Sequence, residues 1–92
     1  MSHTVKEKSK LLLRVRRIRG QVEALEKALE AEAGCTEVLR QIASVRGAMN
    51  GLMSEVMEDH VRTHIANPTI KDNAERSRGA NELLDVVRTY LR

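Results

Sequence analysis

Two long runs of apolar residues, each with the alternating four- and three-residue spacing of a helix seam, constrain the fold of this chain most. The first run spans Leu11–Leu29 and the second spans Val38–Val56. This spacing places the apolar side chains on one stripe of an α-helix. Only a short stretch around Gly34 separates the runs, and Asn67-Pro68 follows the second. Because Gly and Pro both interrupt helices, the pattern predicts two helices of about thirty residues that fold back as a hairpin.

Local signals predict where the helices begin and end. Thr4-Val5-Lys6-Glu7 matches the capping-box pattern, which predicts a helix start at Thr4. Gly34 is expected to supply the left-handed residue that ends the first helix. Within the second helix, Gly51 is expected where another helix packs closely. Residues 67–79 are polar and are predicted to form a loop with room for a first weak helical turn, followed by a third, shorter helix over Ala80–Leu91. The chain is therefore predicted to be all-α, with one domain over residues 1–92.

The composition limits both the assembly and the class of function. A hairpin of 92 residues exposes its seam, so we expect two hairpins to pair as an antiparallel four-helix bundle. Aromatic residues make up 1% of the chain, which excludes stacking platforms for single-stranded nucleic acid. The single cysteine excludes an intrachain disulfide and indicates a reducing compartment, the cytoplasm. The longest aliphatic run is Leu11–Leu13, so no membrane partner is expected.

Basic residues are concentrated in the first twenty positions. This segment contains seven basic residues and one acidic residue, a net charge of +6, whereas the other 72 residues sum to −3. Such a polarised distribution favours a polyanion, usually nucleic acid, although a solvated helix face would look the same. Lys10, Arg14 and Arg17 follow one helical stripe and are the first candidates for DNA contacts. Arg16 and Arg19 lie on other faces of the same helix and complete the set.

The hairpin predicts where the histidines and the cysteine lie. His60 and His64 are four residues apart, so both imidazoles share one helix face, a spacing that suits two ligands of one metal ion. If the chain turns near residues 33 and 34, His3 lies opposite His64 and Glu7 lies opposite His60. Cys35 is 25 residues from His60 on the same helix, or roughly 37 Å away. Cys35 therefore cannot join the histidines within one chain.

An antiparallel dimer would place Cys35 of one protomer beside His60 and His64 of its partner. A thiolate with several imidazoles suits Ni(II) or Co(II), with Zn(II) as a further candidate, and extra ligands near His3 favour the first two. The sequence contains no H-E-x-x-H and no glycine-rich phosphate loop. We therefore expect a sensing site in a protein that is not an enzyme and has no small organic substrate.

The residues that carry these arguments resemble the RcnR/CsoR family of all-helical bacterial transcriptional repressors. The resemblance covers essentially all 92 positions, and its signatures are Arg14–Gln21 (RVRRIRGQ), Gln41–Met53 (QIASVRGAMNGLM) and Cys35. It implies a three-helix protomer, a dimer built on an antiparallel four-helix bundle, and a homotetramer made of two dimers. It also implies a repressor of double-stranded operator DNA without a helix-turn-helix, released when an effector occupies the site around the cysteine.

Four positions distinguish the effectors within this family, and the resemblance places His3, Cys35, His60 and His64 there. This combination looks like the nickel- and cobalt-sensing branch of RcnR and DmeR, whose members control metal efflux or detoxification genes. Copper-sensing members have a second cysteine where this chain has His64. The formaldehyde-sensing FrmR branch uses a proline at the second position, where this chain has Ser2, and typically an acidic residue in place of His64.

Two other functions fit the sequence. A repressor of the FrmR type would respond to formaldehyde through Cys35 and the N-terminal amine, which an aldehyde can bridge. A metal-buffering or structural bundle would bind nucleic acid without regard to its sequence or to metal.

Overall fold

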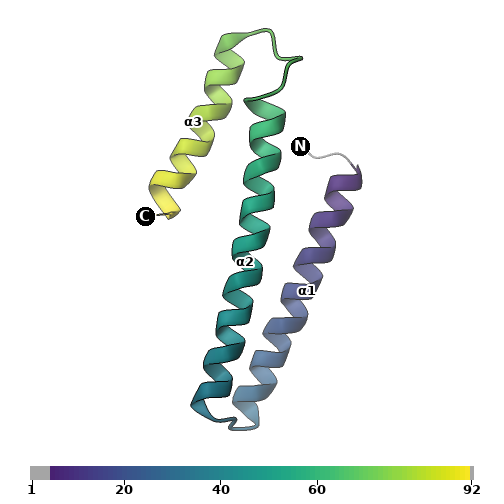
Figure 1. Ribbon diagram of the computed structural model, residues 1–92, viewed down its shortest axis with the longest axis vertical. Coiled ribbons are helices and arrows are strands. Elements are labelled where there is room, and N and C mark those ends of the chain that lie inside the picture. The colour runs from purple at the N-terminus through teal and green to yellow at the C-terminus, as the bar shows by residue number, and fades with distance from the viewer. Residues whose placement is uncertain (1–4, 92) are drawn as a thin grey trace. The chain divides into compact units, whose positions relative to one another are not determined.

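The computed structural model describes the backbone of residues 5–91 and the side chains from Glu7 onward. This range contains three α-helices and no strand: α1 (Val5–Glu30), α2 (Cys35–His64) and α3 (Asn73–Tyr90) (Figure 1). The predicted all-α, three-helix chain is thus confirmed. The predicted helix start at Thr4 lies outside the described residues. Among those residues, no helix combines the length and apolarity that a membrane span requires.

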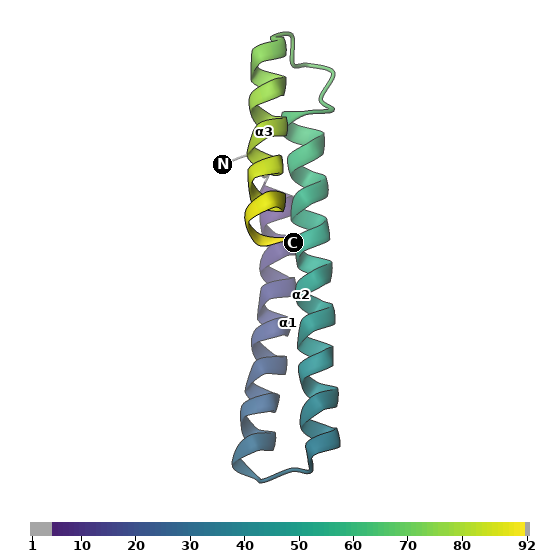
Figure 2. The same ribbon diagram turned by 90° about the vertical axis from the view of Figure 1, so that its left-hand side faces the viewer.

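The described chain divides into two compact units that share α2. One unit contains α1 and α2 as far as Met53, and the other contains the rest of α2, from Ser54, together with α3. In the first unit, α1 and α2 run antiparallel as the predicted hairpin (Figure 1). In the second unit, α3 runs back along the C-terminal part of α2, as both views show (Figure 2).

The apolar seams divide into a covered half and an exposed half. Ile18 is the buried apolar residue of the described chain, and Leu25, Val38 and Val45 are half-buried. The alternate members of the same seams are exposed by 45–58% of their surface; they are Val15, Val22, Leu29, Ile42 and Met49. A single hairpin therefore covers only every second seam residue, and a continuous apolar stripe stays open to solvent.

The turn between α1 and α2 differs from the prediction at Gly34. The left-handed residue is Glu32, with a φ of 55°, whereas no described glycine has a positive φ. The amide of Ala33 donates to the Ala28 carbonyl at 2.9 Å, and the amide of Glu32 donates to the Leu29 carbonyl at 3.1 Å. These two bonds form a Schellman motif, which ends α1 without help from Gly34.

Gly34 instead directly precedes α2, which begins at Cys35. Its carbonyl accepts from the amides of Glu37 (3.0 Å) and Val38 (3.1 Å), which are the first turns of the new helix. Gly34 is therefore the residue that precedes the helix, a position where glycine is tolerated because the backbone there is not yet helical. The prediction that Gly34 ends α1 was wrong, because the Schellman bonds place the left-handed conformation at Glu32, two residues earlier.

The left-handed Glu32 provides a test of this turn. A side chain in this conformation costs about 1–2 kcal/mol relative to glycine, part of which the greater freedom of glycine in the unfolded chain offsets. We predict that Glu32→Gly raises the free energy of unfolding by about 0.5–1 kcal/mol, measured by urea denaturation at fixed protein concentration. Glu30→Gly, which lies in the last turn of α1, should instead lower it by about 1 kcal/mol. Equal effects of both variants would contradict the assignment of Glu32.

The third helix is longer than predicted. Residues 73–79, predicted as a loop, form the first two turns of α3. Asp72 caps this helix, because its side chain accepts from the amide of Ala74 at 2.9 Å. Asp72 and Glu75 repeat the capping-box spacing that predicted the first helix, so the signal was present in the sequence. Gly79 was wrongly taken as the end of the loop; it lies inside the helix and is buried.

Candidate metal and DNA sites

The last turn of α2 holds the two histidines that the sequence predicted as a pair. The ring centroids of His60 and His64 are 4.8 Å apart and the ring planes are inclined by 44°. Both residues are half-buried. His60 also borders a hollow of about 260 Å³ whose other lining residues are apolar except for Glu82. Two imidazoles therefore lie side by side at the end of a rigid element, with open space next to one of them.

A hydrogen bond to α3 orients one of these rings. Nε2 of His60 lies 2.8 Å from the carbonyl oxygen of Gly79. A carbonyl oxygen can only accept, so Nε2 carries a hydrogen, and in the neutral imidazole the lone pair is then on Nδ1. Metal-binding histidines are commonly held in this way, with one nitrogen donating to a carbonyl and the other facing the metal. The bond thus leaves Nδ1 as the nitrogen of the neutral His60 ring that a metal could reach.

The same glycine packs against the second histidine. A methyl group at Gly79 would lie 2.5 Å from the carbonyl oxygen of His64 and 2.8 Å from its Cβ. Only a residue without a side chain allows α3 to approach the end of α2 this closely. Gly79 therefore contacts both histidines, one through its carbonyl and the other through its bare Cα. Sequence reasoning missed this role, although a glycine inside a helical pattern is a recognised sign of close packing.

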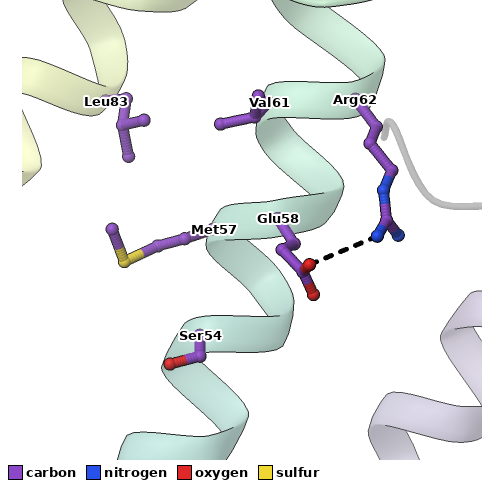
Figure 3. Close-up of a pocket in the computed structure, with 6 residues that line it drawn as sticks. All are labelled: Ser54, Met57, Glu58, Val61, Arg62 and Leu83. Atoms are coloured by element: carbon purple, nitrogen blue, oxygen red, sulfur yellow. Dashed lines mark hydrogen bonds and ion pairs between the residues drawn. The ribbon is translucent and has the colours of Figure 1, made fainter.

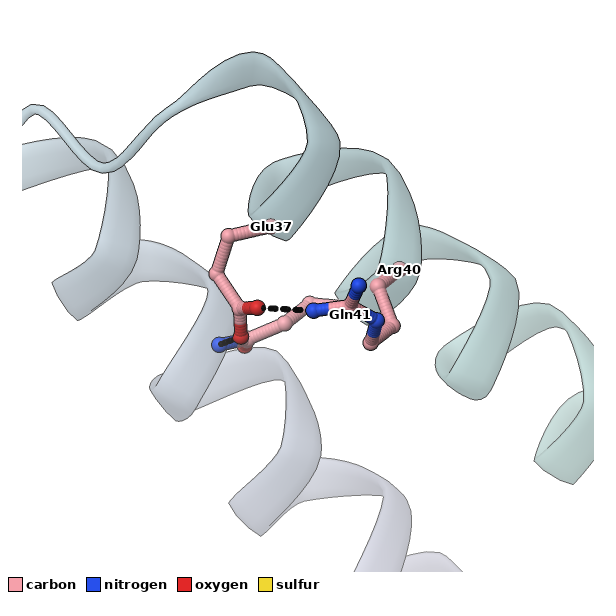
Figure 4. Close-up of polar contacts among 3 residues, drawn as sticks. All are labelled: Glu37, Arg40 and Gln41. Carbon is pink, nitrogen blue, oxygen red and sulfur yellow. Dashed lines mark hydrogen bonds and ion pairs between the residues drawn. The ribbon is translucent and has the colours of Figure 1, made fainter.

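Cys35 lies at the opposite end of α2, as its first residue, and is exposed. Both oxygens of Glu37, in the same turn, are already engaged: Oε2 accepts from Nη1 of Arg40 at 2.6 Å and Oε1 from Nε2 of Gln41 at 3.2 Å (Figure 4). Glu37 is thus directed along its own helix rather than toward the thiol.

Of the three predicted metal ligands within the described residues, His60 and His64 lie together and Cys35 lies apart from them. His3 lies outside the described residues, and the whole of α2 separates Cys35 from the His60 and His64 pair. In the described range, no three residues among His, Cys, Asp and Glu form a cluster that could hold a metal ion. Two imidazoles fit Ni(II), Co(II) or Zn(II) as a partial ligand set. Completion of the set by Cys35 of a second chain stays a prediction.

A second hollow lies between α2 and α3, with a volume of about 410 Å³ (Figure 3). Met57, Val61 and Leu83 give it an apolar lining, and its charged residues, Glu58 and Arg62, pair with each other at 3.2 Å on α2. The carboxylate of Glu58 is thus already paired with the guanidinium of Arg62. This hollow therefore lacks the ligand chemistry of the histidine pair.

The predicted DNA-binding residues all lie on α1. Lys10, Arg16, Arg17 and Arg19 are exposed, whereas Arg14 is half-buried. A methyl group on Gly51 would lie 3.0 Å from Nη1 of Arg14, so the tip of the Arg14 side chain lies against α2 there. This contact is with a flexible side chain, so the expected close packing of another helix at Gly51 stays a prediction.

Arg17 shares the side of α1 that faces α2. It borders, with Arg14, a hollow of about 190 Å³ in the hairpin, together with Ile18, Gln21 and Ala48. Arg14 and Arg17 thus lie on the side of α1 toward α2, and Arg17 is exposed there, as Arg16 and Arg19 are on the other faces.

Comparisons with known proteins give a consistent result. The sequence profile of a family described as metal-sensitive transcriptional repressors matches residues 7–89. The chain is 51% identical over the full length of both proteins to an uncharacterised protein from the bioA 5′ region of Serratia marcescens. It is 44% identical, again over both full lengths, to the transcriptional repressor RcnR of Salmonella paratyphi B.

A solved structure shares the fold. It is a glutamate-to-histidine variant of the formaldehyde-responsive regulator FrmR from Salmonella enterica serovar Typhimurium, with a TM-score of 0.86 and 46% sequence identity. The match covers 96% of this chain and 98% of the other.

The close approach at Gly79 predicts a large cost for a single methyl group. We expect Gly79→Ala to lower the free energy of unfolding by about 1–3 kcal/mol, because the helices must separate at His64. Gly47→Ala is the matched control: no atom lies within 4 Å of its added methyl group, so it should raise stability by about 0.5–1 kcal/mol. Urea denaturation followed by circular dichroism measures both. A neutral Gly79→Ala variant would contradict the close approach.

Proposed function

Because this chain belongs to the family of metal-sensitive transcriptional repressors, we propose that it represses transcription by binding operator DNA and is released by Ni(II) or Co(II). The family consists of repressors and not of enzymes. The paired imidazoles of His60 and His64, 4.8 Å apart, are the observation that carries the choice of a metal effector. We further propose that it acts in the cytoplasm, where its DNA lies.

His64 supports a metal rather than an aldehyde as the effector. The similar solved structure is a formaldehyde-responsive regulator in which histidine was introduced in place of glutamate at position 64 of that chain. The present chain has a histidine at its own position 64. An imidazole beside that of His60 adds a ligand of intermediate softness, which nickel, cobalt and zinc accept. The 44% identity to RcnR supports the same branch.

We propose that two chains complete each metal site. His3, His60 and His64 of one protomer and Cys35 of its partner would supply three imidazoles and one thiolate, which together would bind the cation. The exposed apolar stripe of the hairpin supports this assembly, because antiparallel pairing of two hairpins would cover it. The dimer would pair again as a homotetramer, consistent with the small core of the single chain.

The basic segment of α1 would hold the DNA. Exposed cations neutralise phosphates and release counterions, which gives affinity without requiring a recognition helix. Lys10, Arg16, Arg17 and Arg19 are exposed for this purpose. Arg14 lies over Gly51, so its guanidinium is set by the packing of the hairpin. A tetramer would present four such segments to one operator.

Release requires that the metal prefer a protein conformation that binds DNA less well. Within this chain, the hydrogen bond from His60 Nε2 to the Gly79 carbonyl links the ring to α3. The Cα of Gly79 packs directly against His64. A movement of the His60 ring or of the His64 backbone would therefore displace α3 relative to the end of α2. We propose that these contacts transmit occupancy of the site to the rest of the protomer.

Formaldehyde is the second candidate effector, because the similar solved structure is a formaldehyde-responsive regulator and Cys35 is exposed. The thiol and the N-terminal amine would each form a bond to the aldehyde carbon, whose oxygen leaves as water. The product would gain about 12 Da and would be absent in Cys35→Ala. A bundle that only buffers metal would bind DNA with an affinity indifferent to sequence and to metal.

Fluorescence anisotropy on the chain's own promoter DNA separates these functions. We predict that nickel or cobalt releases the wild-type protein and that His64→Ala abolishes release, because the imidazole pair is broken. Affinity for DNA without metal should be retained in His64→Ala, which serves as the control for folding. Release by formaldehyde alone, with or without His64, would assign the chain to the aldehyde-responsive function instead.

Salt dependence tests the assignment of the DNA-binding segment. Arg17→Ala should reduce the steepness of log K against log salt by about 0.9 for each phosphate that the protein no longer neutralises. Arg40→Ala is the control, because Arg40 is an exposed arginine of α2 that pairs with Glu37. A slope that Arg40→Ala lowers as much as Arg17→Ala would place the DNA elsewhere on the protein.

A further inference from the structure

The C-terminal end of α2 is closed by backbone and side-chain hydrogen bonds together: the amides of Ile65 and Ala66 donate to the Val61 carbonyl at 3.0 and 2.7 Å. The last carbonyls of a helix have no partners within it and must be satisfied by other groups. Asn67 donates from Nδ2 to the carbonyl of Thr63 at 3.3 Å, and its Oδ1 accepts from the amide and hydroxyl of Thr69. The segment after His64 is therefore folded over the end of α2 and reaches Asp72, where α3 begins.

One arginine of α3 holds this segment at three points. Arg76 donates from Nε to the carbonyl of Ile65 at 2.8 Å, and from Nη2 to the carbonyls of Asn67 (3.2 Å) and Ile70 (2.9 Å). Its side chain is half-buried. A guanidinium can bind acceptors in several fixed directions at once, whereas a lysine ammonium carries its three donors on a single atom. This set of hydrogen bonds therefore requires arginine and not only a positive charge.

Arg76 lies three residues before Gly79, one turn along α3. Gly79 is the residue that accepts from His60 Nε2 and packs against His64. A slip of α3 by one residue would move this carbonyl by about 1.5 Å along the helix and rotate it by about 100°. The 2.8 Å bond to His60 would not survive such a slip. The position of α3 along α2 therefore decides how His60 is oriented.

We propose that Arg76 is a positioning residue, which holds α3 in the register that keeps Gly79 against His60 and His64. Its side chain joins the segment that follows α2 to the first turn of α3, and the next turn carries the contact to the histidines. The effect on the orientation of His60 follows from the contacts of the chain itself. The effect on metal binding rests on the proposed function.

The tautomer of His60 in the metal-free protein tests this role. Wild type should show His60 mainly in the form with hydrogen on Nε2, observed in a nitrogen-correlated NMR spectrum of the imidazoles. Arg76→Lys should show a mixture of both tautomers, because the charge is kept but the three hydrogen bonds can no longer form together. Arg78→Lys, at an exposed arginine of the same helix, is the matched control and should resemble wild type.

Cobalt affinity, measured by competition with a chelator, gives the second readout. Arg76→Lys should bind Co(II) about 10-fold more weakly than wild type, the usual effect of removing a group that orients a ligand. Arg78→Lys should bind as wild type does. Failure of wild type itself to bind Co(II) or Ni(II) would refute the proposed function, while the tautomer comparison would still decide the role of Arg76.

Two results would overturn the role of Arg76. The first is a wild-type tautomer pattern in Arg76→Lys. The second is loss of helical circular dichroism in both Arg76→Lys and Arg76→Gln, since Arg76 would then be needed for folding itself rather than for register within a folded chain. A changed tautomer with unchanged Co(II) affinity would overturn the link to metal binding.

Discussion

The contact of Gly79 with the last turn of α2 is the constraint on which the histidine pair depends. Because Gly79 has no side chain, α3 reaches the carbonyl and Cβ of His64, and the Gly79 carbonyl reaches Nε2 of His60. The spacing of the two histidines alone would place their rings on one helix face. The glycine adds the orientation, because it defines which nitrogen of His60 carries hydrogen.

The hairpin of α1 and α2, in contrast, leaves many of its apolar and basic side chains exposed to solvent. Alternate seam residues face solvent, as do most of the arginines of α1. An apolar stripe needs a protein surface to cover it, and a cationic segment needs a polyanion. These two requirements explain why the proposed function needs both a second copy of the chain and DNA. In the proposed function, Cys35, exposed at the start of α2, likewise requires the histidines of a second chain to complete a metal site.

The sequence predicted the features that depend on periodicity and charge. The two long helices, the pairing of His60 with His64 and the basic character of α1 all follow from spacing within one element. Features that depend on contacts between elements were missed. Gly34 was assigned the cap that Glu32 provides, because a left-handed glutamate is set by the Schellman bonds around it and not by its own preference.

The start of α3 was placed too late for a different reason. The polar residues after Pro68 looked like a loop, and Gly79 looked like its end, although Asp72 and Glu75 carry the capping-box spacing and Asp72 caps the helix. The role of Gly79 could not be predicted from spacing because it depends on where α3 crosses α2. A metal site that combines Cys35 with the histidines requires a second chain, so it stays a prediction.

The central claim is that metal and operator DNA compete through one conformational equilibrium. Thermodynamic linkage requires that each ligand weaken the other by the same factor. The most direct measurement is the affinity of the protein for Ni(II), with and without saturating operator DNA. We predict that DNA lowers the nickel affinity by the factor with which nickel lowers the DNA affinity, and an unchanged nickel affinity would contradict this claim.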